Sequence, residues 1–146
     1  MNDNNLHKEI DLIQACINRM ANNSFMLKGW LVTIIAAMIT LSMNKQNAEV
    51  IVTAAALPLL CFWYLDAFYL RTELKYRKLY DWVLKARQKG NTDFMYCLDT
   101  KRFNNDVDSV FGVMFSQTLL PFYGILLLAW GGLFFYLLFF KGECNV

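Results

Sequence analysis

The sequence predicts an all-α integral membrane protein with three transmembrane helices and long cytoplasmic helical extensions, and two observations lead to this fold class. Hydrophobic residues make up 57% of the 146-residue chain and charged residues only 18%, whereas soluble domains are roughly half apolar and about a quarter charged. Three segments, 25–43, 50–70 and 119–140, are apolar and nearly free of charge. Each approaches the ~20 residues that cross a bilayer core, where helices satisfy their own backbone hydrogen bonds. We therefore expect one transmembrane domain of three spans.

Lysine and arginine residues are distributed unevenly among the segments that connect the spans. Nine lie between residues 71 and 117, whereas the turn 44–49 has only Lys45 and the tail 141–146 has one. Cytoplasmic segments of membrane proteins carry the excess of these residues. This bias predicts that the N-terminus and residues 71–117 lie in the cytoplasm and that the C-terminus lies outside.

The first third of the chain is expected to form one long helix, from about residue 6 to residue 43. Apolar residues recur there at alternating spacings of four and three, which is typical of a helix with one buried seam. The part 6–24 would protrude into the cytoplasm, and 25–43 would form the first span. The seam consists of Leu6, Ile10, Ile13, Ile17, Met20, Ser24, Leu27, Leu31, Ile34, Met38 and Leu41.

The second span is expected to continue beyond the membrane as a cytoplasmic helix, 71–89, which ends at Gly90 and Asn91. Pro58 lacks a backbone donor and predicts a kink near the middle of the span, where a gating hinge is one interpretation. A polar loop follows at 91–104, and a short amphipathic segment leads into the third span. The inner face of the second helix is predicted to contain Tyr69, Thr72, Tyr76, Leu79, Val83 and Ala86.

One carboxylate, Asp66, lies inside the second apolar run. Sixteen uncharged residues follow Lys28 up to the outer turn, and sixteen precede Asp66 in the second span. At ~1.5 Å per residue both side chains would lie near the cytoplasmic edge of a core that is about 30 Å thick. A charge in a span is costly unless it is paired or hydrated. An inter-span ion pair between Lys28 and Asp66, within or between protomers, is one interpretation, and independent snorkelling to the headgroups or a direct role in ion passage are the alternatives.

The sequence contains no recognisable catalytic constellation. Its single histidine is His7, and it has no nucleophile elbow, phosphate-binding loop or His–Glu metal motif. We therefore expect a protein that is not an enzyme and that needs no metal or other cofactor.

Small residues and threonines form a stripe on the first span, at Gly29, Thr33, Ala37 and Thr40. Such a stripe allows helices to approach closely. It predicts either a pore wall with Thr hydroxyls facing water or ordinary packing inside one protomer. Three spans are too few to enclose a transport site alone, so a pore would require a homo-oligomer.

The helix after the second span interleaves aromatic residues with cations in "RTELKYRKLYDWVLKARQK". In an oligomer such helices would form a ring of positive charge, which would bind nucleotides or short single strands through phosphate charge and base stacking. Anionic lipid headgroups are a competing partner, and the cytoplasmic bias of positive charge explains part of the pattern. The expected ligand-binding residues are Arg71, Lys75, Arg77, Lys78 and Lys85.

The stretches "RMANNSFMLKGWLVTIIAAMITL" and "FWYLDAFYLRTELKYRKLYDWV" resemble small bacterial membrane proteins that act as effectors in anti-phage defence. The resemblance is to the membrane effectors of Hailong-type systems, which are oligomeric channels gated by short DNA made by a nucleotidyltransferase partner. It covers the first two spans and the helix after the second. It implies a multi-pass protein of the bacterial inner membrane.

Together these features predict a homo-oligomeric inner-membrane effector of anti-phage defence, with a tetramer as the expected assembly. A cytosolic nucleotide or short oligonucleotide would gate its ion-conducting pore, and activation would depolarise the membrane and cause abortive infection. The alternative is a non-conducting membrane anchor or scaffold whose cytoplasmic helices dock a partner protein.

Overall fold

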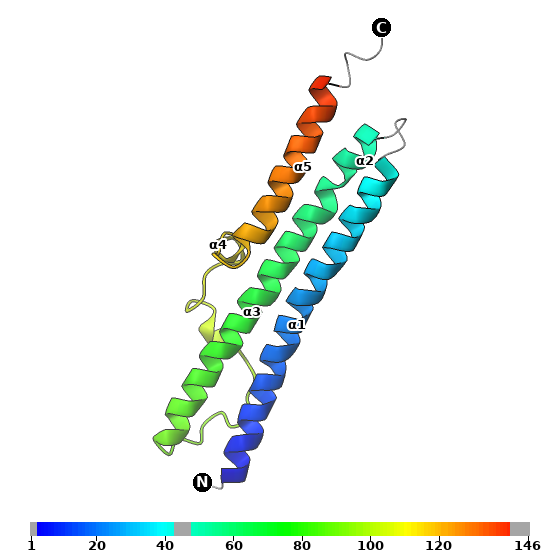
Figure 1. The fold of residues 1–146 in the computed structure, drawn as a ribbon. Coiled ribbons are helices and arrows are strands. Elements are labelled where there is room, and N and C mark those ends of the chain that lie inside the picture. The colour runs from blue at the N-terminus through cyan, green and yellow to red at the C-terminus, as the bar shows by residue number, and fades with distance from the viewer. Residues whose placement is uncertain (1–2, 43–47, 141–146) are drawn as a thin grey trace.

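The computed structural model describes residues 3–42 and 48–140, which are mainly helical and contain no strand. Three long helices lie side by side (Figure 1), and all three are long and apolar enough to cross a membrane. The predicted all-α class with three candidate spans is therefore confirmed. The helices are α1 (Asp3–Ser42), α2 (Ala48–Ala54), α3 (Ala56–Gln88), the 3₁₀ turn η1 (Lys101–Phe103), α4 (Val110–Met114) and α5 (Leu120–Phe140).

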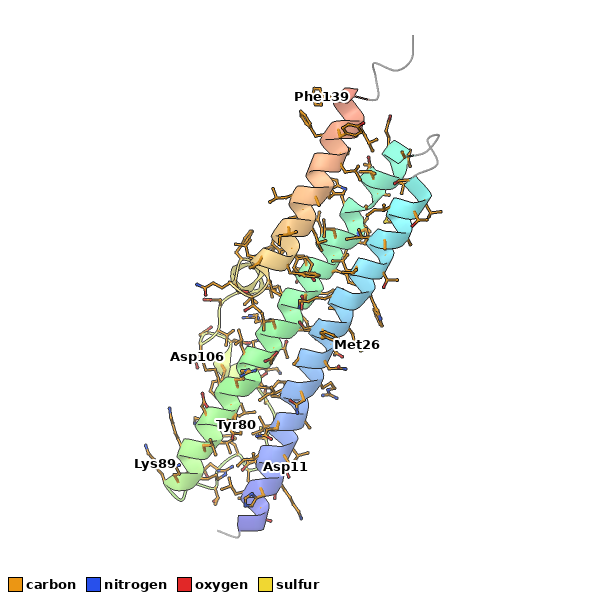
Figure 2. The ribbon with its side chains drawn as sticks, viewed as in Figure 1. Asp11, Met26, Tyr80, Lys89, Asp106 and Phe139 are labelled. Atoms are coloured by element: carbon orange, nitrogen blue, oxygen red, sulfur yellow. The ribbon has the colours of Figure 1, made fainter. Side chains whose placement is uncertain are left out.

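Helices α1 and α3 form an antiparallel pair along their whole length, whereas α5 accompanies only the half nearer α2 (Figure 1). The other half, residues 3–23 of α1 and 67–88 of α3, is called the two-helix extension below. Figure 2 shows Lys89 at the tip of this extension and Phe139 at the opposite end of the molecule. The predicted helices 6–24 and 71–89 lie in the extension.

The buried residues fall into two clusters, one in each half of the molecule. In the three-helix half, the cluster consists of Leu31, Leu59, Trp63, Ala67, Val113, Leu119 and Tyr123. In the two-helix extension, it consists of Ile13, Leu79, Val83 and Phe103. Most of the predicted seam of α1 is buried or half-buried, but Leu41 is exposed. A helix of 3.6 residues per turn drifts away from a 3.5-residue repeat, so the last member of a long seam turns outward.

The second span is interrupted at Ala55, three residues before Pro58, where a turn separates α2 from α3 although Ala55 keeps helical dihedral angles. Pro58 has no N–H, so the carbonyl of Ala54 loses the donor that a continuous helix would supply. The neighbouring carbonyl of Val52 instead accepts a hydrogen bond of 2.8 Å from the indole of Trp130 on α5. The break in the second span is thus held against the third.

The end of α3 follows the sequence signal at Gly90. Its φ of +74° is in the left-handed region, which glycine adopts without strain. The Gly90 N–H donates to the carbonyl of Arg87, and the Asn91 N–H donates to that of Ala86. This pair of bonds is the Schellman cap that closes a helix C-terminus.

The segment 91–104, predicted as a polar loop, packs against the two-helix extension. Phe103 in η1 is buried against Leu79 and Val83, so the segment covers one side of the two-helix extension. The predicted amphipathic segment 107–115 contains the shorter helix α4, and its Ser109 side chain accepts a hydrogen bond from the Gly112 N–H.

Candidate functional site

A polar node joins the three candidate spans at Asp66. Its carboxylate is completely buried, and Lys28 Nζ on α1 lies 2.5 Å from its Oδ2. The Ser24 hydroxyl, also on α1, donates to Oδ1. The Tyr123 hydroxyl on α5 donates to Oδ2 at 3.0 Å. We call Ser24, Lys28, Asp66 and Tyr123 the polar node; they bring a cation, an anion and two hydroxyls together inside the bundle.

Neighbouring residues position the side chains of the node. Ser24 and Lys28 are one helical turn apart, and the ammonium donates to the Ser24 hydroxyl at 2.8 Å. Tyr123 belongs to the first turn of α5, and its ring stacks on Trp63 of α3 at a centroid distance of 5.7 Å. A buried carboxylate is stable only when its lone pairs and charge are matched. The node matches them with donors from two neighbouring helices.

The structure brings the predicted partners Lys28 and Asp66 together within one chain. Asp66 is too deeply buried to snorkel, because none of its side chain reaches the surface of the protomer. Ser24 was predicted only as a member of the apolar seam, and Tyr123 had no predicted role. The position of Ser24, one turn before Lys28, was a signal for the first. The contact of Tyr123 depends on the packing of α5, which no spacing in the sequence reports.

The stripe on the first span faces away from the other helices. Gly29, Thr33, Ala37 and Thr40 are all exposed on the protomer, and a Cβ added to Gly29 would meet nothing within 4 Å. The Thr33 and Thr40 hydroxyls donate to the carbonyls four residues earlier, at 3.0 and 2.9 Å. The interpretation as packing inside one protomer is therefore wrong, since α3 packs on the opposite face of α1.

Two of the five predicted ligand-binding cations make polar contacts within the protomer. Arg71 donates through Nε to the carbonyl of Asp108 at 2.8 Å and through Nη2 to that of Asn104 at 3.3 Å. Arg77 pairs with Glu73 one turn before it, at 2.7 Å. Arg71 therefore anchors the segment that precedes α4, and Arg77 has its charge compensated on α3.

The other three predicted cations remain available on one side of α3. Lys78 and Lys85 are exposed and Lys75 is half-buried, and within the described part of the chain none of them has a hydrogen bond or ion pair. Desolvation and the positive charge of Arg71 lower the pKa of the Lys75 ammonium. The three lysines form a positively charged stripe on α3.

An aromatic residue lies within this stripe and carries a further cation. Trp82 is four residues after Lys78 and three before Lys85, which places the three side chains on one helix face. The Arg102 guanidinium stacks over Trp82, 4.6 Å from the ring centroid, and over Phe94 at 4.5 Å. We call Lys75, Lys78, Trp82, Lys85 and Arg102 the basic face. Arg102 was not predicted, because it belongs to the 3₁₀ turn η1, 14 residues beyond the end of α3.

A buried ion pair closes the tip of the two-helix extension. Arg87 on α3 donates to both carboxylate oxygens of Glu9 on α1, at 2.8 and 2.9 Å, and the two side chains are 1% and 2% exposed. Hydrogen bonding to Glu9 raises the pKa of the Arg87 guanidinium. Sequence analysis missed this pair, although Glu9 lies four residues before the buried Ile13 and so on the same helix face.

The same pair organises the chain that follows α3. Arg87 Nη1 donates to the carbonyls of Asn91 and Asp93, at 2.6 and 3.2 Å. Glu9 accepts from the Tyr96 N–H at 3.1 Å. Phe94 and Tyr96 have φ of 56° and 60°, a left-handed conformation that is costly for residues with a Cβ. The Glu9–Arg87 clamp therefore holds a strained turn in place.

Comparisons with known proteins were made for the whole chain. No family model matches it, and searches of curated proteins and of solved structures found no match.

Proposed function

We propose that the chain is a homo-oligomeric membrane effector that forms an ion-conducting pore controlled by a cytosolic anionic ligand. The observation that carries the proposal is the outward stripe of Gly29, Thr33, Ala37 and Thr40 on α1. Copies arranged around an axis would place this stripe against water, and its small residues would leave an open path. Four copies are the assembly that we expect.

The closed interior of the protomer favours a path between copies. Among the described residues of the span region the buried charged group is Asp66, whose partners are the other members of the polar node. In the described residues every fully buried side-chain nitrogen and oxygen has a hydrogen-bond partner. The rest of the three-helix core is apolar, with Trp63 and Tyr123 stacked at its centre. Ions would cross an interface between protomers rather than the core of one.

The basic face is the proposed receptor for the ligand. Lys75, Lys78 and Lys85 offer positive charge that forms no ion pair within the described residues, and clusters of lysine and arginine bind phosphate groups. A nucleotide or short single strand fits these cations and the stacked Trp82. The resemblance to Hailong-type effectors supplies the context, in which a nucleotidyltransferase partner makes the ligand and opening depolarises the bacterial inner membrane.

A second candidate function is a non-conducting anchor or scaffold. It is favoured by the two-helix extension, whose tip is locked by the Glu9–Arg87 clamp and bears exposed aromatic residues such as Phe94 and Tyr96. A rigid tip of this kind suits the docking of a partner protein.

Conductance after cysteine modification separates the two candidates. Thr33→Cys and Ala37→Cys variants are reconstituted in planar bilayers with a single-stranded oligonucleotide and treated with a positively charged methanethiosulfonate. The pore proposal expects a ligand-dependent current that modification reduces. Ile39→Cys is the matched control, because Ile39 is exposed on a different face of α1. A protein that is monomeric and conducts no current in any condition would contradict the pore proposal and support the scaffold function.

A further inference from the structure

Helix α4 has an apolar face that the protein leaves open. Val113 is buried against α3, whereas Phe111 and Phe115 on the other side are 68% and 63% exposed. The exposed faces of Tyr64 and Phe68 on α3 continue this surface, and the Tyr64 ring lies 6.4 Å from that of Phe111. The four rings form an aromatic surface, called the α4 elbow below, that no described residue covers.

The elbow lies at the level of the polar node. The indole of Trp63 donates to the Met114 carbonyl at 3.0 Å, and the same ring stacks on Tyr123, which binds Asp66. Figure 1 shows α4 end-on while α3 and α5 run along the page, so α4 crosses the direction of the spans. The five residues of α4 thus lie across the bundle where α5 begins.

The length of α5 places the elbow outside the third span. Its 21 residues extend about 31 Å, which already crosses a bilayer core of about 30 Å. The chain is nevertheless uncharged from Ser109 to Phe140, so the apolar stretch begins before the span does. An apolar helix next to a span, across its direction and at its end, fits the boundary between headgroups and acyl chains.

Polar contacts hold the chain at the point where the charged segment ends and the uncharged stretch from Ser109 begins. Arg71 binds the carbonyl of Asp108, the last charged residue before α4, and that of Asn104. Figure 2 shows Asp106 on the side of α4 that faces the two-helix extension. Asp106 therefore lies on the extension side of α4, where the polar side of a headgroup layer would be.

From these observations we propose that the α4 elbow is a lipid-binding surface. It lies in the headgroup layer at the end of the spans where the polar node is located, and Phe111 and Phe115 enter the acyl region. The bilayer is the occupant because the elbow extends over exposed Tyr64 and Phe68 of the second span, and because exposed Leu120 follows it in the chain at the start of α5. This contact does not depend on the pore proposal.

Photo-cross-linking of the full chain in vesicles of phosphatidylethanolamine and phosphatidylglycerol tests the proposal. Phe111 and Phe115 are replaced one at a time by p-benzoyl-phenylalanine, which keeps an aromatic ring at each position. Phe135, exposed on α5, is the lipid-facing control. Phe94, exposed at the tip of the two-helix extension, is the control far from the spans. Circular dichroism verifies the helix content of each variant, and intact mass detects lipid adducts.

Lipid adducts at positions 111 and 115 are expected at the yield of position 135 and several-fold above that of position 94. Cross-linked dimers in place of lipid adducts would overturn the proposal, because a second copy would then cover the elbow. Yields no higher than at position 94 would also overturn it, because the elbow would then face water. If only one of the two variants, at position 111 or at position 115, keeps the native helix content, its adducts alone decide between these outcomes.

Discussion

The hydroxyl of Tyr123 donates a 3.0 Å hydrogen bond to the buried carboxylate of Asp66, 57 residues earlier in the chain. This bond connects α5 to α3 at the point where Lys28 of α1 also meets the carboxylate. The three candidate spans therefore converge on one charge. Loss of Ser24, Lys28 or Tyr123 would leave the buried Asp66 carboxylate with fewer partners, so the node contributes to the way in which the helices pack.

Removal of the Tyr123 hydroxyl tests the connection to α5. Tyr123→Phe keeps the ring that stacks on Trp63 but deletes the donor to Asp66. Hydrogen bonds to charged groups contribute about 1.5–3 kcal/mol to the free energy of unfolding. The variant should lose about this much stability, which a lower unfolding temperature in detergent would report. Tyr64→Phe is the matched control, because Tyr64 is exposed on the same helix as Asp66. Equal effects of the two substitutions would contradict the role of Tyr123.

A charge swap tests the ion pair. Lys28→Asp or Asp66→Lys alone places like charges together in the bundle, and breaking a buried pair typically costs about 3–5 kcal/mol. The double swap restores the attraction, and the Ser24 and Tyr123 hydroxyls can accept hydrogen bonds from the relocated ammonium. We expect the double variant to recover much of the folded, assembled protein in size-exclusion chromatography. Recovery no better than that of the single variants would mean that the two charges do not act as a pair.

The Glu9–Arg87 clamp should control the stability of the chain after α3. Arg87→Lys keeps the charge but cannot make two parallel bonds to Glu9 and reach the carbonyls of Asn91 and Asp93. The strained residues Phe94 and Tyr96 would then relax, and residues 91–96 should be cleaved much faster by protease. Lys85→Arg, an exposed position on the same helix, should leave the cleavage rate unchanged. Unaltered cleavage of the Arg87 variant would show that other contacts hold the turn.

Charge reversal on the basic face tests the proposed ligand site. Lys75→Glu and Lys78→Glu should abolish binding of short single-stranded DNA and nucleotides, because the same stripe would repel phosphate. Binding by the unchanged protein should fall steeply with added salt, as phosphate contacts release counterions. Lys8→Glu, on exposed α1 surface, is the control.

The result also bears on the choice between the two functions. Salt-sensitive binding that survives in the Lys8 variant and is lost in the Lys75 and Lys78 variants supports control by an anion. A purified oligomer without salt-sensitive binding, together with unchanged toxicity of the two reversals in cells, would remove the ligand-gated pore and leave the scaffold.

Thiol labelling in intact cells tests the orientation. The distribution of Lys and Arg predicts that Cys97 is cytoplasmic and that Cys144, which lies outside the described residues, is external. A membrane-impermeant maleimide should label Cys144 and spare Cys97. Cys97 is half-buried rather than enclosed, so permeabilised cells should label it and provide the control. Labelling of Cys97 in intact cells would reverse the predicted topology.

Local signals in the sequence were sufficient for the helices and for the relative level of Lys28 and Asp66. Runs without charge located the three candidate spans, because a bilayer core selects for apolar length alone. Equal uncharged runs beside Lys28 and Asp66 placed the two charges at one level, since helix rise converts residue number into depth. Gly90 marked the end of α3, because the left-handed conformation of a cap favours glycine. Orientation, assembly and function remain predictions.

Contacts between distant segments required the tertiary structure. Tyr123 meets Asp66, and Arg87 meets Glu9, only because the rotation and crossing of the helices bring those faces together, and both depend on the sum of many side-chain contacts. The same packing assigned Arg71 to the carbonyls before α4 and turned the Gly29 stripe outward. A helical spacing shows which residues share a face, but what that face meets is decided by the free energy of packing the whole bundle.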